Sequence, residues 1–236
     1  MAEPVKTRRR YDNSRRQAQA RATRAEVVTA ARHLFLARGY PATTIEAIGE
    51  AASVPLATIY RLFGSKRGIL SAVLDVAFAG DDEPIALHDR PGARAAAAQT
   101  DPRRLLAGYA RLARGVLERS GPLQQMLRTA AAADPECASL LETTRRQRLA
   151  GQSRIASALA ARGALAGGLT EPGALDIIYT LMSPEVHHIL TAERRWSASR
   201  YEQWLARTLA AVLLPPHAGP SARPPDPAPP ASPSPP

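Results

Sequence analysis

The 236-residue sequence has one cysteine, Cys137, few aromatic residues and no long apolar run. A single cysteine excludes an internal disulfide, and with it a secreted disulfide scaffold or a zinc site built from several cysteines. No apolar stretch approaches the ~18 residues that a membrane-spanning helix requires, and the first residues lack the apolar segment of a signal peptide. The sequence therefore predicts a cytoplasmic protein with enough chain to bury a core.

The motifs of common catalytic sites are also missing. The sequence contains no glycine-rich phosphate loop, no G-x-S-x-G turn and no cluster of histidine with carboxylates. His187 and His188 are adjacent, which on a helix separates their rings by about 100°. The acidic run 81–83 is typical of a solvated loop. We expect no catalytic residue, no metal and no cofactor, and a helical-bundle enzyme is a remote alternative.

Positive charge is concentrated at the start of the chain. The net charge is +10, and residues 1–24 hold eight basic and two acidic residues. A basic terminal arm is typical of a polyanion binder, although a merely solvated tail is the alternative. Residues 215–236 contain eleven prolines, too many for a helix or a core. We therefore expect a disordered basic arm at 1–20 and a disordered proline-rich tail at 215–236.

Between these ends the apolar residues repeat at helical spacing and do not alternate as they would in a strand. This predicts an all-α fold of about nine helices. Gly121-Pro122 is expected to separate two helices and Pro184 to kink another, while 80–100 and 163–170 are expected to be loops. The expected helices cover about 24–38, 45–52, 55–63, 65–79, 103–120, 123–133, 135–161, 172–191 and 199–214.

The helices expected at 45–52 and 55–63 have the size of a helix-turn-helix unit. Ile48 on the first and Ile59 on the second supply apolar contacts between them. The outward face of the second helix begins with small residues and continues with hydroxyl and cationic groups, which suit bases and phosphates. That face consists of Leu56, Ala57, Thr58, Tyr60 and Arg61. By itself, the pattern also fits an ordinary helical hairpin in a bundle.

Several short segments at matching spacing carry a resemblance to a known family. They are Ala31 to Phe35, Gly39-Tyr40, Thr43-Thr44-Ile45, Ala51 to Val54, Ala57 to Tyr60 and Ser65-Lys66-Arg67. Over residues 22–78 the sequence resembles the DNA-binding domain of the TetR family of transcriptional regulators. The rest resembles more loosely the actinobacterial-type C-terminal domains of that family. The resemblance implies a three-helix DNA-binding domain at 21–79, a linker at 80–100 and a helical dimerisation and ligand-binding domain at 101–214.

The resemblance also implies which residues contact double-stranded DNA. They are Arg24, Thr44, Pro55, Leu56, Ala57, Thr58, Tyr60, Arg61 and Lys66. Thr44 and Lys66 would bind phosphates at helix starts, and Arg61 is the best candidate for contact with guanine. Arg24 and the arm before it would reach the neighbouring backbone or minor groove. Pro55 stands where the family has a serine cap and Leu62 where it has tyrosine or histidine, so we expect greater reliance on the arm.

For the second domain, the resemblance implies dimerisation and ligand sensing. The residues expected in the homodimer interface are Leu175, Ile178, Met182, Val186, Ile189, Trp204, Leu205, Thr208 and Val212. The residues expected to line a cavity for a small apolar effector are Tyr109, Leu112, Met126, Leu127, Cys137, Leu141, Tyr179, Met182 and His187. Each of these side chains could instead belong to the core of the monomer.

The residues and the resemblance together predict a sequence-specific, homodimeric DNA-binding regulator. The most specific hypothesis is a repressor that a small apolar ligand releases from a palindromic operator. The alternative is an activator, or a non-specific DNA binder, without ligand control.

Overall fold

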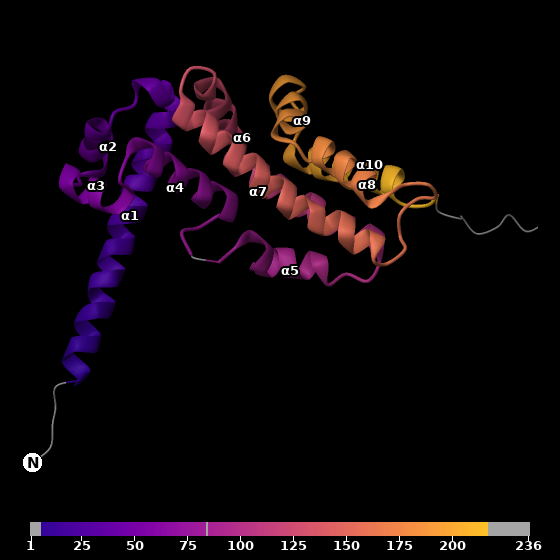
Figure 1. Ribbon diagram of the computed structural model, residues 1–236, viewed down its shortest axis with the longest axis horizontal. Helices are drawn as coiled ribbons and strands as arrows, with labels where there is room; N and C mark the ends of the chain where they lie inside the picture. Colours follow the sequence, from indigo (N-terminus) through magenta and orange to yellow (C-terminus); the bar gives the residue numbers. More distant parts are fainter. Residues whose placement is uncertain (1–5, 84, 217–236) are drawn as a thin grey trace, which may run out of the picture.

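The computed structural model describes residues 6–83 and 85–216, and Figure 1 shows them as an elongated arrangement of helices. In those two ranges there is no strand, which confirms the all-α prediction. Residues 1–5 of the predicted arm and 217–236 of the predicted tail lie outside the described residues. Within the described part, no helix is both long enough and apolar enough to cross a bilayer.

The first helix, α1, spans Lys6–Ala42 and has a kink at Gly39, where φ is 77°. The predicted helix began near Arg24, and the prediction of a disordered arm is wrong for residues 6–20. Residues 15–24 are mostly Arg, Ala and Gln, which favour helix, and extending an existing helix avoids the cost of nucleation. Figure 1 shows this first half of α1 projecting from the domain as a single rod.

Three shorter helices complete the first domain: α2 at Ile45–Ala52, α3 at Leu56–Phe63 and α4 at Lys66–Ala79. Their bounds agree with the predicted ranges to within one residue. Side chains cap two of these helices, since the hydroxyl of Thr44 accepts from the Ala47 N–H and that of Ser65 from the Gly68 N–H. Pro55 occupies the N-cap of α3 and contributes no side-chain hydrogen bond.

The segment 80–100, predicted as a loop, contains a 3₁₀ turn at Leu87–Asp89 and helix α5 at Pro91–Ala97. Ala96 of α5 is buried against α6, where a Cβ on Gly108 would lie 2.8 Å from the Ala96 Cβ. A run of alanines favours helix, and the missing Cβ of Gly108 lets the two backbones approach closely. These two effects order a segment that has no apolar stripe of its own.

The long helix α6 spans Pro102–Ala131, so the predicted break at Gly121-Pro122 is wrong. Leu117 and Leu123, on either side of the proline, are both buried. Packing of both halves offsets the backbone hydrogen bond that proline removes. Helix α7 at Pro135–Ala160 follows the prediction, with Asp134 as its N-cap.

The remaining helices are α8 at Glu171–Leu181, α9 at Pro184–His188, a π-helical turn at Ile189–Glu193 and α10 at Ala198–Leu213. A single kinked helix at 172–191 was predicted, but the chain breaks at Ser183. The Ser183 hydroxyl accepts from the Val186 N–H, and Pro184 takes the first position of α9. Proline fits that position without strain, so it starts a new helix here.

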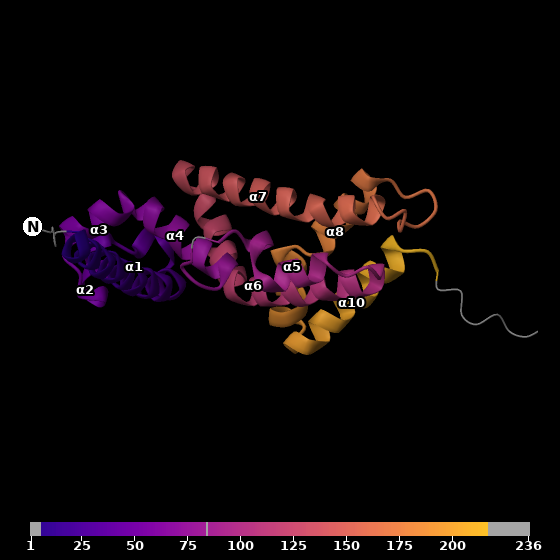
Figure 2. The same cartoon turned by 90° about the horizontal axis from the view of Figure 1, so that it is seen from below.

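Two apolar cores divide the described residues. The first contains α1–α4 together with Leu123 and Leu127 of α6 and Cys137 of α7. The second joins the first half of α6 to the later helices and includes Leu105 and Tyr201. The boundary between the cores therefore falls inside α6 and not in the segment 80–100. In Figure 2, α6 and α7 run along the molecule between the α1–α4 end and the α8–α10 end.

Candidate functional site

Helices α2 and α3 pack closely at the turn between them because a glycine of α2 faces α3. Ser53 has a left-handed conformation, with φ of 53°, and the Val54 N–H donates to the Gly49 carbonyl over 2.9 Å. A Cβ on Gly49 would lie 3.1 Å from the Val54 carbonyl oxygen and 3.3 Å from Ile59. Close approach at the turn thus depends on Gly49, which the sequence analysis missed although a glycine inside a helix signals such contact.

Helix α3 presents one face to the core and the other to solvent. Ile59 is 1% exposed, whereas Leu56 is 38% and Tyr60 48% exposed. Pro55, Ala57 and Arg61 are also exposed, and Thr58 is half-buried. The predicted outward residues therefore lie on an open face. Figures 1 and 2 both place α2 and α3 at the end of the molecule opposite α8 and α10.

Thr44 and Lys66, the two expected phosphate ligands at helix starts, differ in their surroundings. The exposed hydroxyl of Thr44 accepts from the Ala47 N–H over 3.1 Å, which leaves its own hydrogen available to donate. The Lys66 ammonium donates to the Tyr40 carbonyl over 3.0 Å and lies 4.3 Å above the Tyr40 ring. Lys66 is thus bound within the protein, while Thr44 remains open to a phosphate.

Arg24 also pairs inside the protein. Its Nε donates to both carboxylate oxygens of Asp82, at 3.2 and 3.1 Å, and its guanidinium lies 5.0 Å from the centre of the Phe63 ring. These contacts connect α1 to the end of α3 and to the loop after α4. The structure therefore does not present Arg24 as a free cation for DNA.

A contact between Tyr40 and Cys137 joins the first domain to α7. Burial, and then the charges of Asp134 and Glu136, raise the pKa of Cys137, to about 11, while the hydrogen bond to Tyr40 acts in the opposite direction. Burial likewise raises the pKa of Tyr40 above its usual value. Both groups are protonated at neutral pH, so Cys137 is a packing residue between the domains. The described residues include no group of three or more potential metal ligands.

The nine residues expected to line an apolar cavity do not meet around one cavity. Met126, Leu127, Cys137 and Leu141 belong to or pack against the first core, and Tyr109 and Met182 belong to or pack against the second. Leu112 is half-buried, Tyr179 carries the Arg148 guanidinium 3.7 Å from its ring centre, and His187 packs edge-on against Tyr201. These apolar residues are divided between two cores because the first half of α6 packs in the second core and its second half packs in the first.

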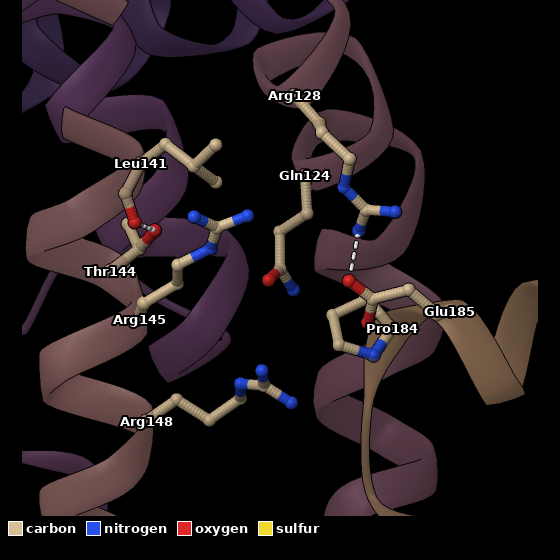
Figure 3. Close-up of a pocket in the computed structure, with 8 residues that line it drawn as sticks. All are labelled: Gln124, Arg128, Leu141, Thr144, Arg145, Arg148, Pro184 and Glu185. Atoms are coloured by element: carbon tan, nitrogen blue, oxygen red, sulfur yellow. Dashed lines mark hydrogen bonds and ion pairs between the residues drawn. The ribbon is translucent and has the colours of Figure 1, made fainter. Parts of the chain in front are cut away.

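The structure instead has a narrow cleft between α6, α7 and α9, shown in Figure 3. Its lining residues are Gln124, Arg128, Leu141, Thr144, Arg145, Arg148, Pro184 and Glu185. Its volume of about 10 Å³ admits about one water molecule. Three guanidinium groups face one carboxylate, so the cleft is cationic and not apolar. Arg145 and Arg148 are three residues apart on one face of α7, but such a pair on a helix is usually solvated, so its spacing did not indicate a cleft.

Three of the residues expected in a dimer interface are buried within the monomer. Ile178, Met182 and Leu205 lie in the second core, so their assignment to the interface is wrong. The stripe on α10 faces α6, whereas α8 packs against α7 and α10, and all four helices contribute to the same core. Ile189 and Val212 are exposed at 46% and 45%. The other four, which are half-buried, are Leu175, Val186, Trp204 and Thr208.

Helices α1–α4, with the close turn at Gly49 and the open face of α3, form a helix-turn-helix domain. Residues 27–73 match the family described as "Bacterial regulatory proteins, tetR family". The matched residues lie within this domain. Over 54 residues it is 43% identical to the uncharacterized HTH-type transcriptional regulator YvkB of Bacillus subtilis, a match that covers 23% of this chain and 29% of that protein.

Solved structures resemble the chain over most of its length. NalD of Pseudomonas aeruginosa, the secondary repressor of the MexAB-OprM multidrug efflux pump, is 20% identical with a TM-score of 0.62, over 82% of this chain and 97% of that one. The structure of the SmeT–triclosan complex is 18% identical with a TM-score of 0.65, over 88% and 99%. These likenesses establish that the second domain shares the fold of those proteins.

Proposed function

We propose that the protein is a transcriptional repressor that binds a palindromic DNA operator as a homodimer and is released by a small molecule. The observation that carries this proposal is the open face of α3 in a domain that matches the TetR family. A repressor and a triclosan complex among the solved structures of the same fold support ligand control. The cleft does not support the apolar ligand that the sequence suggested.

In this proposal α3 enters the major groove. The guanidinium of Arg61 contacts a guanine edge, and Leu56 and Ala57 at the start of the helix contact bases. Tyr60, Thr58 and the hydroxyl of Thr44 bind the phosphate backbone, aided by the dipole of α2. The roles of Arg24 and Lys66 are indirect, because their contacts with Asp82, Phe63 and Tyr40 position α3 and α4 within the domain. Pro55 at the start of α3 has no side-chain hydrogen-bonding group, so it makes only van der Waals contact with the groove.

The two-fold axis of the homodimer passes near α8 and α10. Exposed or half-buried apolar residues remain there after the monomer core is formed, among them Val212, Ile189 and Trp204. A two-fold dimer would place two α3 helices about one turn of DNA apart, roughly 34 Å, which requires an operator with inverted half-sites.

Capture of sheared host DNA on the purified protein at physiological salt, followed by sequencing, tests this proposal. A few enriched sites that share a palindrome are expected. Fluorescence anisotropy with such a site then compares two variants of equal charge. R61A removes a proposed base contact and should weaken binding by about 1–3 kcal/mol. R94A removes an exposed arginine of α5, far from α3, and should have little effect.

Two outcomes would contradict the proposal. Equal losses in R61A and R94A would mean that α3 does not read bases. A smooth, salt-sensitive capture without enriched sites would favour non-specific binding, which the basic first half of α1 could support.

A further inference from the structure

Buried polar side chains are concentrated between α6, α7 and the start of α9. In the described ranges the buried polar side chains are Thr43 of the first domain and Ser120, Gln124, Thr144, Gln152, Ser183 and His187 of the second. Some of their hydrogen-bonding capacity is unused, since Gln152 Oε1 and His187 Nε2 have no partner. Native interiors rarely leave such atoms unsatisfied, which marks this seam as unusually polar, although neither residue lines the cleft of Figure 3.

Arginines from two helices surround the cleft at this seam. Figure 3 shows Arg145 extended into the cleft toward Gln124. Arg145 is exposed, and it has no hydrogen-bond or ion-pair partner among the side chains that the structure describes, 15–83 and 85–216. Arg148 donates to the Tyr179 carbonyl over 3.2 Å, and Arg128 pairs with Glu185 over 2.7 Å. One carboxylate therefore faces three guanidinium groups, an excess of two positive charges.

The Arg128–Glu185 pair forms only one of the two parallel hydrogen bonds that such a pair can form. A carboxylate can accept two parallel hydrogen bonds from one guanidinium, but here the Arg128 Nε and the Glu185 Oε2 both lack a partner. We infer that this cleft binds the carboxylate or phosphate group of a small effector. When no such anion is bound, the Glu185 carboxylate occupies the position of the anion beside Arg128. An incoming oxyanion bonds Arg145 and Arg128 and displaces Glu185, which opens the cleft beyond its present volume.

Such a displacement would act on the DNA-binding domain through α6, and in this respect the inference rests on the proposed function. Gln124 and Arg128 lie next to Leu123 and Leu127, both fully buried in the core shared with α1 and α4. Arg119 of α6 also donates to the Ala77 carbonyl near the end of α4, over 3.0 Å. Arg128 and Arg119 both belong to α6. Loss of the contact between Arg128 and α9 would therefore change the packing of the helix that contacts α4.

Isothermal titration of the full chain with acetate, citrate and inorganic phosphate at low chloride tests the site without DNA. At least one probe should bind with a Kd of about 1 mM or tighter. R145Q should weaken that binding by about tenfold, because it removes a charge-assisted hydrogen bond. R146Q is the matched control: Arg146 is the next residue of α7, and it bonds the Thr143 hydroxyl. E185Q should tighten binding by about threefold, because the competing charge is gone.

The probes also distinguish the anion, since preference for citrate or acetate indicates a carboxylate and preference for phosphate a phosphoryl group. The site is refuted if no probe binds at 10 mM (~10 times the expected Kd), if R145Q and R146Q lose affinity equally, or if E185Q weakens binding. Adding the bound probe to an operator complex should lower DNA affinity in the wild type and not in R145Q. An unchanged DNA affinity would overturn the effector role, whereas failure to find any operator would refute the proposed function alone.

Discussion

Burial of His187 makes the stability of the second domain sensitive to pH. Burial, followed by the nearby charge of His188, lowers its pKa below the usual 6.5, against the opposing effect of Glu118. The unfolded chain therefore binds more protons than the folded one just below pH 6.5, and stability must fall as the pH decreases through that value.

We expect the thermal unfolding midpoint to fall between pH 7 and pH 5.5, a range that spans about one unit below the ordinary histidine pKa. The fall should be much smaller in H187Q and only slightly smaller in H188Q, since burial is the main cause of the shift and the charge of His188 contributes less. Differential scanning calorimetry of the three proteins at both pH values gives the comparison. Identical pH dependence in H187Q and the wild type would assign the effect to another group.

Glycines in α4 and α7 differ in whether a side chain would fit, so substitutions at the two should have opposite effects on stability. A Cβ on Gly68, in the first turn of α4, would lie 2.0 Å from the Phe63 carbonyl oxygen. G68A must shift α3 against α4, and we expect a loss of about 1–3 kcal/mol in the free energy of unfolding. G151A, in α7, meets nothing within 4 Å and should stabilise by about 0.5–1 kcal/mol. Urea unfolding of both variants measures these values, and a stable G68A would contradict the close approach of α3 and α4.

The helical first half of α1 should contribute electrostatic affinity for DNA. Deleting residues 1–20 removes six basic and two acidic residues. Because each phosphate contact contributes about 0.9 to the slope of log K against log salt, the deletion should weaken binding and flatten this slope. Deleting 217–236, which carries one arginine and one aspartate, is the control. Anisotropy titrations at several salt concentrations measure the slopes, and equal slopes for the wild type and the 1–20 deletion would exclude the role.

At the scale of elements, local signals predicted most of the fold. Thr44, Ser65 and Asp134 start helices because side-chain caps act over three residues, which a sequence displays directly. The predictions failed where distant packing decided the outcome. Pro122 remains inside α6 because both halves of that helix are buried, and α5 forms because Gly108 makes room for Ala96.

The same distinction holds for the candidate sites of the whole molecule. The open face of α3 follows from the spacing of one short helix, so the sequence predicted it. The cationic cleft joins Arg128, Arg145 and Glu185, which are far apart in the chain and on three different helices. Charged residues on helices are usually solvated, so nothing in their spacing distinguishes a shared cleft. The apolar stripes were visible, but which core each stripe joins depends on how α6 packs.

Two exposed apolar residues allow a test of where the dimer interface lies. Val212 of α10 and Leu149 of α7 are equally exposed apolar residues, at 45% and 44%, on different parts of the surface. If α8 and α10 form the two-fold interface, V212E buries a charge in the dimer and should convert it to monomer, whereas L149E should not. Sedimentation velocity at micromolar concentration measures both.

Because a monomer contacts one half-site, V212E should also lose most of its affinity for a full palindrome and keep its weaker affinity for a half-site. A monomeric wild type, or dissociation by L149E as well, would place the interface elsewhere or remove it.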